Sequence, residues 1–167
     1  METASRVSNS RSAEAAQSRG LCTFWLGGRQ FGLEVGLVAE IVTVEAVLPV
    51  PRAPRAIRGL FNLRGTPIAL LDCAEVLSFG DQASSKAEST ALVIRQDDVL
   101  VALVVDRMEA VLPPGRGVST QPTPEDHPAV GSFLTLEDAP ADSVVTVIDT
   151  AYLRDRLEGI RFTKEVD

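Results

Sequence analysis

Prolines placed between two apolar runs restrict the fold of this chain more than any other feature. The first run, Val38–Val47, is apolar and β-branched apart from Glu40 and Glu45, which favours a strand over a helix. Prolines follow at positions 49, 51 and 54. Each removes a backbone donor and disfavours the α conformation before it, so any strand here lies at a sheet edge. The second run, Ile68–Leu71, ends at Asp72 and predicts a buried strand leading into a turn or helix start.

Two hairpins are predicted from alternating apolar residues on either side of turn signals. The first spans residues 22–35 and turns at Gly27-Gly28. The second joins residues 91–94 to 100–105 around Gln96-Asp97-Asp98. Residues 74–79 predict a short helical turn, and residues 80–90 a polar linker. A longer helix is predicted only at 150–157, capped by Thr150, because the proline-rich connector 112–143 resists helix formation.

The two halves of the chain are related by an internal repeat. When the sequence is shifted so that residue 31 aligns with residue 101, a set of apolar residues in the first half aligns without gaps with a set of apolar residues in the second half. Gly59 and the strand 68–72 have counterparts in Gly131 and the strand 145–149. The repeat predicts two similar all-β units. The aligned pairs are Phe31 with Val101, Leu33 with Leu103, Val35 with Val105, Val38 with Met108 and Ile41 with Val111.

Composition excludes several classes of function. The net charge of −7 and the pI near 4.8 argue against nucleic acid or anionic membrane as a partner, since both attract basic surfaces. No apolar run is long enough to cross a bilayer. Arginines at positions 52, 55, 58 and 64 still allow a local positive face. Cys22 and Cys73 are too few for a disulfide framework, and we expect both to be reduced and buried.

The ends of the chain are expected to be tails. Residues 1–20 carry Arg6, Arg11 and Arg19 among serines, superficially like a transit peptide, but they lack an apolar face and predict a disordered tail. We expect a folded domain at 21–160 and a C-terminal tail at 161–167. Within the domain, one unit is predicted at roughly 36–80 and the other at roughly 90–150 plus the N-terminal strand.

No catalytic, metal or cofactor site is predicted. His127, the single histidine, lies in an acidic, proline-rich loop without a nucleophile motif, so a solvated loop residue is the favoured interpretation over a small β-barrel hydrolase. The acids do not follow calcium-loop spacing and are interpreted as solvated turn residues. They are Asp97, Asp98, Asp106, Glu125 and Asp126.

The order of small motifs resembles the CheW family, the adaptors of bacterial chemosensory arrays. The order is V-x-E-I, P-x-x-P, G-x-x-N-L-R-G-x-x-I and a closing Asp, and the likeness continues through V-V-D at 104–106 and V-I-D at 147–149. It covers roughly residues 22–157. The first set comprises Val38, Glu40, Ile41, Pro51, Pro54, Gly59, Asn62, Leu63, Arg64, Gly65, Ile68 and Asp72.

The resemblance implies a definite fold and task. The fold is all-β: two five-stranded SH3-like barrels packed side by side around a groove, with a short C-terminal helix. The task is that of a non-enzymatic cytoplasmic adaptor in membrane-associated arrays, which links the cytoplasmic tips of chemoreceptors (methyl-accepting chemotaxis proteins) to the regulatory domain of a CheA-type histidine kinase. The first barrel would bind the kinase and the groove the receptor.

The resemblance also assigns a partner-binding surface. On periodicity alone Glu40 is an outward-facing strand residue, and Arg64 makes an ion pair for which Asp72 is the candidate partner. The resemblance places Glu40 and Arg64 on the surface that binds partners, and an arginine fork there suits a partner carboxylate. The valines of this set are either core or groove residues. The full set is Val38, Glu40, Ile41, Gly59, Asn62, Arg64, Gly65, Val104, Val105 and Val111.

The chain departs from the family pattern after the closing aspartate. Leu-Arg commonly follows there, whereas Asp72 is followed by Cys73 and Ala74. The missing arginine motivates an alternative: a diverged adaptor that serves a non-motility chemosensory pathway or competes with another adaptor.

Overall fold

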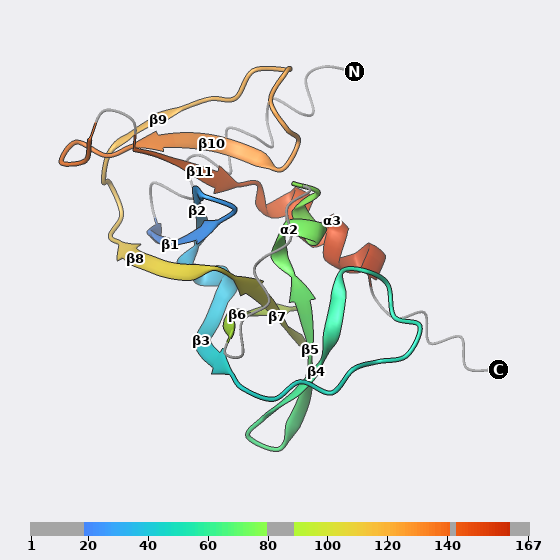
Figure 1. The fold of residues 1–167 in the computed structure, drawn as a ribbon. Helices are drawn as coiled ribbons and strands as arrows, with labels where there is room; N and C mark the ends of the chain where they lie inside the picture. Colours follow the sequence, from blue (N-terminus) through green and yellow to red (C-terminus); the bar gives the residue numbers. More distant parts are fainter. Residues whose placement is uncertain (1–18, 80–88, 141–142, 161–167) are drawn as a thin grey trace.

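A computed structural model describes residues 19–79, 89–140 and 143–160, which form two curled β-sheets side by side with two helices (Figure 1). The strands are β1 (Leu21–Leu26), β2 (Arg29–Glu34), β3 (Val38–Val44), β4 (Ile57–Leu63), β5 (Thr66–Asp72), β6 (Ser89–Gln96), β7 (Val99–Val105), β8 (Arg107–Leu112), β9 (Val118–Thr120), β10 (Val130–Thr135) and β11 (Val144–Ile148). The remaining elements are the 3-10 turn η1 (Val35–Leu37) and the helices α2 (Cys73–Leu77) and α3 (Thr150–Ile160).

The two sheets have the same internal order. One runs β3-β6-β7-β5-β4, and the other runs β8-β1-β2-β11-β10-β9. In each, the third strand has a hairpin partner on one side and a parallel neighbour on the other, because β7 pairs parallel with β5 and β2 pairs parallel with β11. The units exchange strands: β3 follows β2 along the chain but pairs with β6, while β8 follows β7 but pairs with β1. This arrangement confirms the all-β fold and the repeat.

The structure differs from the expected division in two respects. Residues 89–105, expected in the second unit, form β6 and β7 of the five-stranded sheet. The second sheet has six strands instead of five, because the connector contributes the short strand β9. The first difference arises because the units exchange strands. The β6–β7 hairpin completes the sheet that β3 begins, and the β1–β2 hairpin lies in the sheet of β8.

One hydrophobic core joins the two units. Phe24 and Phe31 of the six-stranded sheet stack with ring centroids 6.1 Å apart, and they belong to the same buried cluster as Leu92 and Leu103 of the five-stranded sheet. Burying a side chain of this size contributes about 1.5–3 kcal/mol. A second, smaller cluster lies inside the six-stranded sheet. The units therefore depend on one another for burial.

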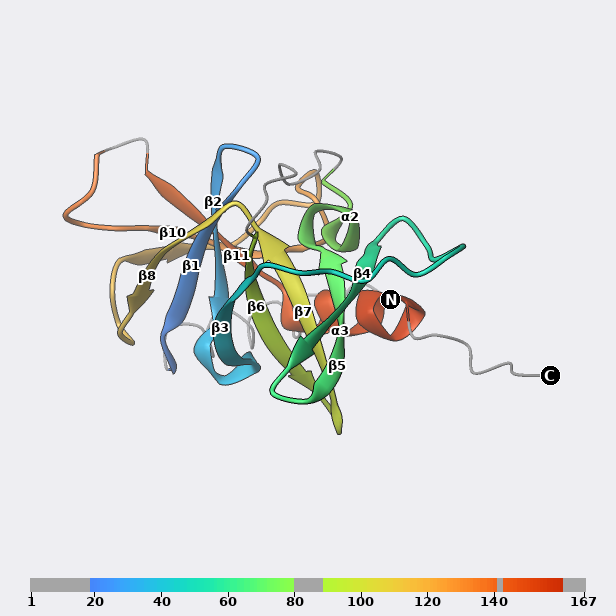
Figure 2. The same cartoon turned by 60° about the horizontal axis from the view of Figure 1, so that its bottom comes forward.

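Both aspartates at the repeat's strand ends begin helices. The Asp72 carboxylate accepts a hydrogen bond from the Glu75 backbone N–H, 3.3 Å away, and so caps α2. The Asp149 carboxylate accepts from the Tyr152 N–H at 2.9 Å in α3. The helices pack against each other (Figure 2), and the Arg156 guanidinium donates to the Val76 carbonyl at 2.8 Å. The predicted helical turn and terminal helix are confirmed, but the cap of the terminal helix is Asp149 and not Thr150, because the helix already begins at Thr150.

Several sequence expectations concern residues that the structure does not describe. The N-terminal tail, most of the polar linker and the C-terminal tail lie outside the described residues. Cys22 and Cys73 are both free and buried, as expected, and burial raises the pKa of each thiol. No helix within 19–79, 89–140 and 143–160 is long and apolar enough to cross a membrane.

Candidate partner-binding surface

Arg64 is held by a tight turn between β4 and β5. Leu63 pairs with Thr66, so Arg64 and Gly65 form a two-residue loop, and their φ angles of 48° and 89° are those of a type I′ turn. Asn62 fixes the turn, because its Oδ1 accepts from the Gly65 N–H at 2.7 Å. Asn62 and Gly65, which both belong to the expected partner-binding set, therefore fix the position of Arg64.

Glu40 and Arg64 meet in a bidentate ion pair. Arg64 Nη1 donates to Glu40 Oε2 at 3.1 Å, and Nη2 donates to Oε1. The side-chain hydrogen bond with Glu40 raises the pKa of Arg64. Glu40 lies on the edge strand β3 and Arg64 beside the opposite edge strand β4, so the contact also shows that the five-stranded sheet curls on itself. Exposed pairs stabilise folds weakly, so stability alone does not explain this pair.

The alternation along β3 differs from that of a simple amphipathic strand, because its charged residue does not lie on the solvent-facing side. Ala39, Ile41 and Thr43 face solvent, and Ile41 remains 44% exposed, whereas Glu40 lies on the half-buried side. Glu40 is therefore not the outward-facing residue that periodicity indicated. Ile41 therefore adds exposed apolar area on the face of β3 opposite to Glu40.

Gly59 acts through the backbone. It is buried, has a φ of 152°, and a Cβ there would lie 2.4 Å from the Leu48 carbonyl oxygen. Leu48 and Leu60 form two backbone hydrogen bonds of 2.8 Å with each other. These bonds hold the proline-rich loop against β4. The loop leaves Leu48 71% exposed and Val47 39% exposed, adding apolar area near the sheet edge. Sequence reasoning missed these two residues, although the prolines after them predicted an edge segment.

The valines of the candidate set fall into different environments. Val104 and Val105 are 1% and 3% exposed in the shared core, so a partner cannot contact their side chains and we remove them from the candidate surface. Val38 is half-buried and packs against the core. Val111 is 60% exposed on the edge strand β8, on the other unit from Glu40.

Asp72 pairs with Arg58, and not with Arg64 as the sequence suggested. Arg58 Nη2 lies 2.9 Å from Asp72 Oδ2, and Asp72 is 2% exposed. The reason is register, since Arg58 stands beside Asp72 near the base of the β4–β5 hairpin while Arg64 is at its tip. Arg58 and Arg64 are each bound to an acid, and Arg52 and Arg55 are exposed in the proline-rich loop.

The half-buried Trp25 forms a second cluster with two exposed charged residues, which sequence reasoning also missed. Arg107 stacks over the indole at 4.6 Å, and Glu109 accepts from both the indole Nε1 at 2.6 Å and Arg107 at 2.8 Å. The hydrogen bond from Trp25 and then that from Arg107 lower the pKa of Glu109. The signal available in the sequence was that the chain's single tryptophan lies in an alternating strand.

We expect the fluorescence of Trp25 to report the protonation of Glu109. Because the folded state lowers the pKa of Glu109, the indole–carboxylate bond persists as the pH falls through the ordinary glutamate range, and it is lost only below that range. The fluorescence transition should therefore have its midpoint below the usual glutamate pKa. Glu109→Gln should abolish the transition. A midpoint at or above the usual value would contradict the contact.

His127 is packed instead of solvated. Its ring lies 4.5 Å from that of Phe79 and 6.0 Å from that of Tyr152, and its Nδ1 accepts from the Ala129 N–H at 3.1 Å. This corrects the expected solvated loop residue and gives the histidine a structural role. Across the described ranges, no group of His, Cys, Asp and Glu is arranged to hold a metal ion.

Comparison with known proteins identifies the family. A family model described as the CheW-like domain matches residues 20–157. The chain belongs to the CheW-like family. The resemblance drawn from the sequence motifs is thereby confirmed, and the fold agrees with the family's SH3-like architecture.

Similar proteins carry the name Chemotaxis protein CheW. That of Treponema pallidum is 27% identical over 95 residues, 55% of this chain and 56% of that protein. That of Thermotoga maritima is 28% identical over 102 residues, 60% of this chain and 65% of that protein. Each match spans less than two thirds of the relative's length. The crystal structure of the scaffolding protein TtCheW from Thermoanaerobacter tengcongensis superposes with a TM-score of 0.67 at 22% identity, over 81% of this chain and 92% of that one, which supports the fold.

Proposed function

We propose that this CheW-like chain is a non-enzymatic adaptor that links chemoreceptors to a CheA-type histidine kinase in the cytoplasm, at membrane-bound receptor arrays. The observation that carries the proposal is the bidentate pair of Glu40 and Arg64 at the surface of the five-stranded unit. Charged groups fixed in advance at a surface favour specific protein binding, because little side-chain freedom is lost on association.

The adaptor acts on the kinase through differential binding. A scaffold alters the balance between two kinase states only if it binds one state more tightly than the other. The kinase regulatory domain binds the five-stranded unit, and Glu40 and Arg64 contact the kinase, the receptor or both. The receptor tip binds between the units, on the side of Val38 and Val111. Weak individual contacts suffice, because the array holds the components at high local concentration.

We expect Arg64→Ala to weaken binding of the kinase regulatory domain, of the receptor tip, or of both by about tenfold or more, since arginine is a frequent hot-spot residue. Arg64→Lys should fall between Ala and wild type, because it keeps the charge but loses the planar fork. Isothermal titration calorimetry with each purified partner measures the effect. Arg95→Ala, an exposed arginine on β6, is the matched control and should bind like wild type.

Two results would contradict this assignment. The adaptor role is excluded if folded wild-type protein binds neither partner at concentrations that saturate a known adaptor. The role of the ion pair is excluded if Arg64→Ala and Arg95→Ala bind both partners equally well. Circular dichroism of each variant separates loss of binding from loss of fold.

A further inference from the structure

An open groove of about 590 Å³ lies on the outside of the five-stranded unit, beside the end of α3. Three apolar side chains form a row across it, because Leu60 of β4 pairs with Ala69 of β5, and Ala69 pairs with Val101 of β7. All three are half-buried, and Val99 at the edge is 52% exposed. The groove therefore presents apolar surface that a bound side chain can contact.

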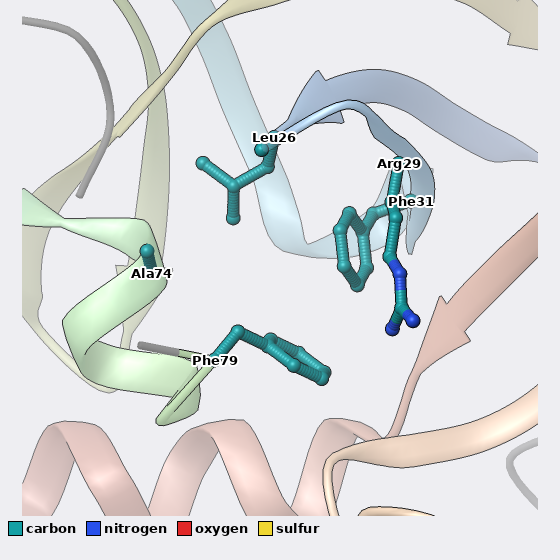
Figure 3. A pocket seen from close by; sticks show the side chains of 6 residues that line it. Leu26, Arg29, Phe31, Ala74 and Phe79 are labelled. Carbon is teal, nitrogen blue, oxygen red and sulfur yellow. The ribbon is translucent and has the colours of Figure 1, made fainter. Parts of the chain in front are cut away.

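The pocket between the two units differs in this respect. It measures about 260 Å³, and Figure 3 shows Leu26, Phe31 and Ala74 in its lining. These three side chains are buried in the shared core and leave a ligand almost no surface to contact. The groove beside α3 is therefore the better candidate for an occupied site.

α3 covers only part of the apolar face that forms the groove. Pro67, Ala69 and Leu71 point to the same side of β5, since side chains alternate along a strand. Leu71 is buried in the same core cluster as Leu157 of α3. Ala69, in contrast, is half-buried and Pro67 is exposed. α3 ends at Ile160, which itself lines the groove, so the apolar face continues past the part that the helix covers.

Two acids give the groove a negative edge. Gln96 pairs with Val99, so Asp97 and Asp98 form a two-residue turn between β6 and β7. Both line the groove and are exposed, and among the described lining residues no side chain is basic. An occupant is therefore expected to combine an apolar side chain with neighbouring basic groups.

We propose that the chain's own residues 161–167 occupy the groove, with the Phe162 ring on the apolar row and with Arg161 and Lys164 beside the acidic turn. These residues follow Ile160 directly and lie outside the described part of the chain. Phe162 is two residues from Ile160, and two extended residues span about 7 Å at most. Because it is attached beside the groove, Phe162 has a high effective concentration there and needs no separate partner. This occupancy is independent of the adaptor role.

The test is methyl NMR of the purified full-length protein, because an aromatic ring stacked on a methyl group shifts its proton resonances. We expect the methyl protons of Val99 and Val101 to resonate upfield in the wild type, and Phe162→Ala to remove this shift. Glu165→Gln, which changes a tail residue outside the proposed contacts, is the matched control and should retain it. Dilution of the wild type should leave the shift unchanged, since the contact lies within one chain.

A charge variant tests the acidic edge. Asp98→Asn should lower the ratio of docked to undocked tail, read from the size of the shift, by about two- to fivefold, in line with the strength of an exposed ion pair. Glu137→Gln, which changes an exposed acid on the other unit, should leave this ratio unchanged. The proposal is overturned if Phe162→Ala and wild type have the same Val99 and Val101 resonances, or if Asp98→Asn and Glu137→Gln give equal ratios. It is also overturned if the shift disappears on dilution, which would identify a second copy of the chain as the occupant.

Discussion

Gly59→Ala is expected to destabilise the protein by about 3 kcal/mol, because it combines backbone strain with overpacking. The new methyl group would lie 2.4 Å from the Leu48 carbonyl oxygen and 2.5 Å from Val47 Cγ1. Relief requires the proline-rich loop to lift away from β4, which breaks the two Leu48–Leu60 backbone hydrogen bonds. Urea unfolding followed by circular dichroism measures the loss.

Gly28→Ala is the matched control for this prediction. Gly28 also has a positive φ, 77°, but nothing lies within 4 Å of the position that a Cβ would occupy there. Its substitution should cost only the strain of the left-handed conformation, about 1 kcal/mol. Equal losses for the two variants would show that the close approach of the loop to Gly59 does not contribute to stability.

Asp72→Ala is expected to cost about 3 kcal/mol, because it removes a buried carboxylate that both pairs with an arginine and caps a helix. Oδ2 lies 2.9 Å from Arg58 Nη2, and Oδ1 accepts from the Glu75 N–H. The variant removes the Asp72 carboxylate from the Arg58 guanidinium, whose side chain is 22% exposed. Equilibrium unfolding of variant and wild type at neutral pH gives the difference.

Asp72→Asn separates the two roles of Asp72. Asparagine is as good a helix cap as aspartate but carries no charge for Arg58. We expect it to lose about two thirds as much stability as Asp72→Ala, because it keeps the cap contribution of about 1 kcal/mol. A free energy of unfolding for Asp72→Ala within about 0.5 kcal/mol of wild type would contradict the importance of this ion pair.

Local structure was predictable from the sequence where a residue type dictates backbone geometry. Gly27-Gly28 marked the first hairpin, and Asp72 marked the end of a strand and the start of a helix. The repeat that aligns residue 31 with residue 101 correctly predicted two similar units. A register shift beside Gly59 has its counterpart at Gly131 in the second unit.

The assignment of strands to sheets was not predictable in the same way. Periodicity shows that a segment is a strand but does not show which edge it pairs with. β6 and β7 were therefore placed with the segments that follow them in the chain, although they pair with β3 and β5. Only long-range register settles such an exchange between two similar units.

The candidate site was predictable in its residues but not in its contacts. Glu40 and Arg64 were chosen because of the family resemblance, and nothing in the sequence indicated that they bind each other across the barrel. From the sequence, Val104 and Val105 were compatible with either the core or the groove. Their burial in the structure shows that they belong to the core. Leu48 was missed because a single exposed apolar residue leaves no periodic signal.

The central claim is that this CheW-like chain joins a kinase to receptors. Its most direct test is a co-sedimentation assay with vesicles that carry a chemoreceptor from the same genome, together with the corresponding CheA-type kinase. We expect the kinase to sediment with the vesicles only when wild-type chain is added, and Arg64→Ala to reduce this fraction while Arg95→Ala does not. Sedimentation of the kinase that is unaffected by adding the wild-type chain would contradict the claim.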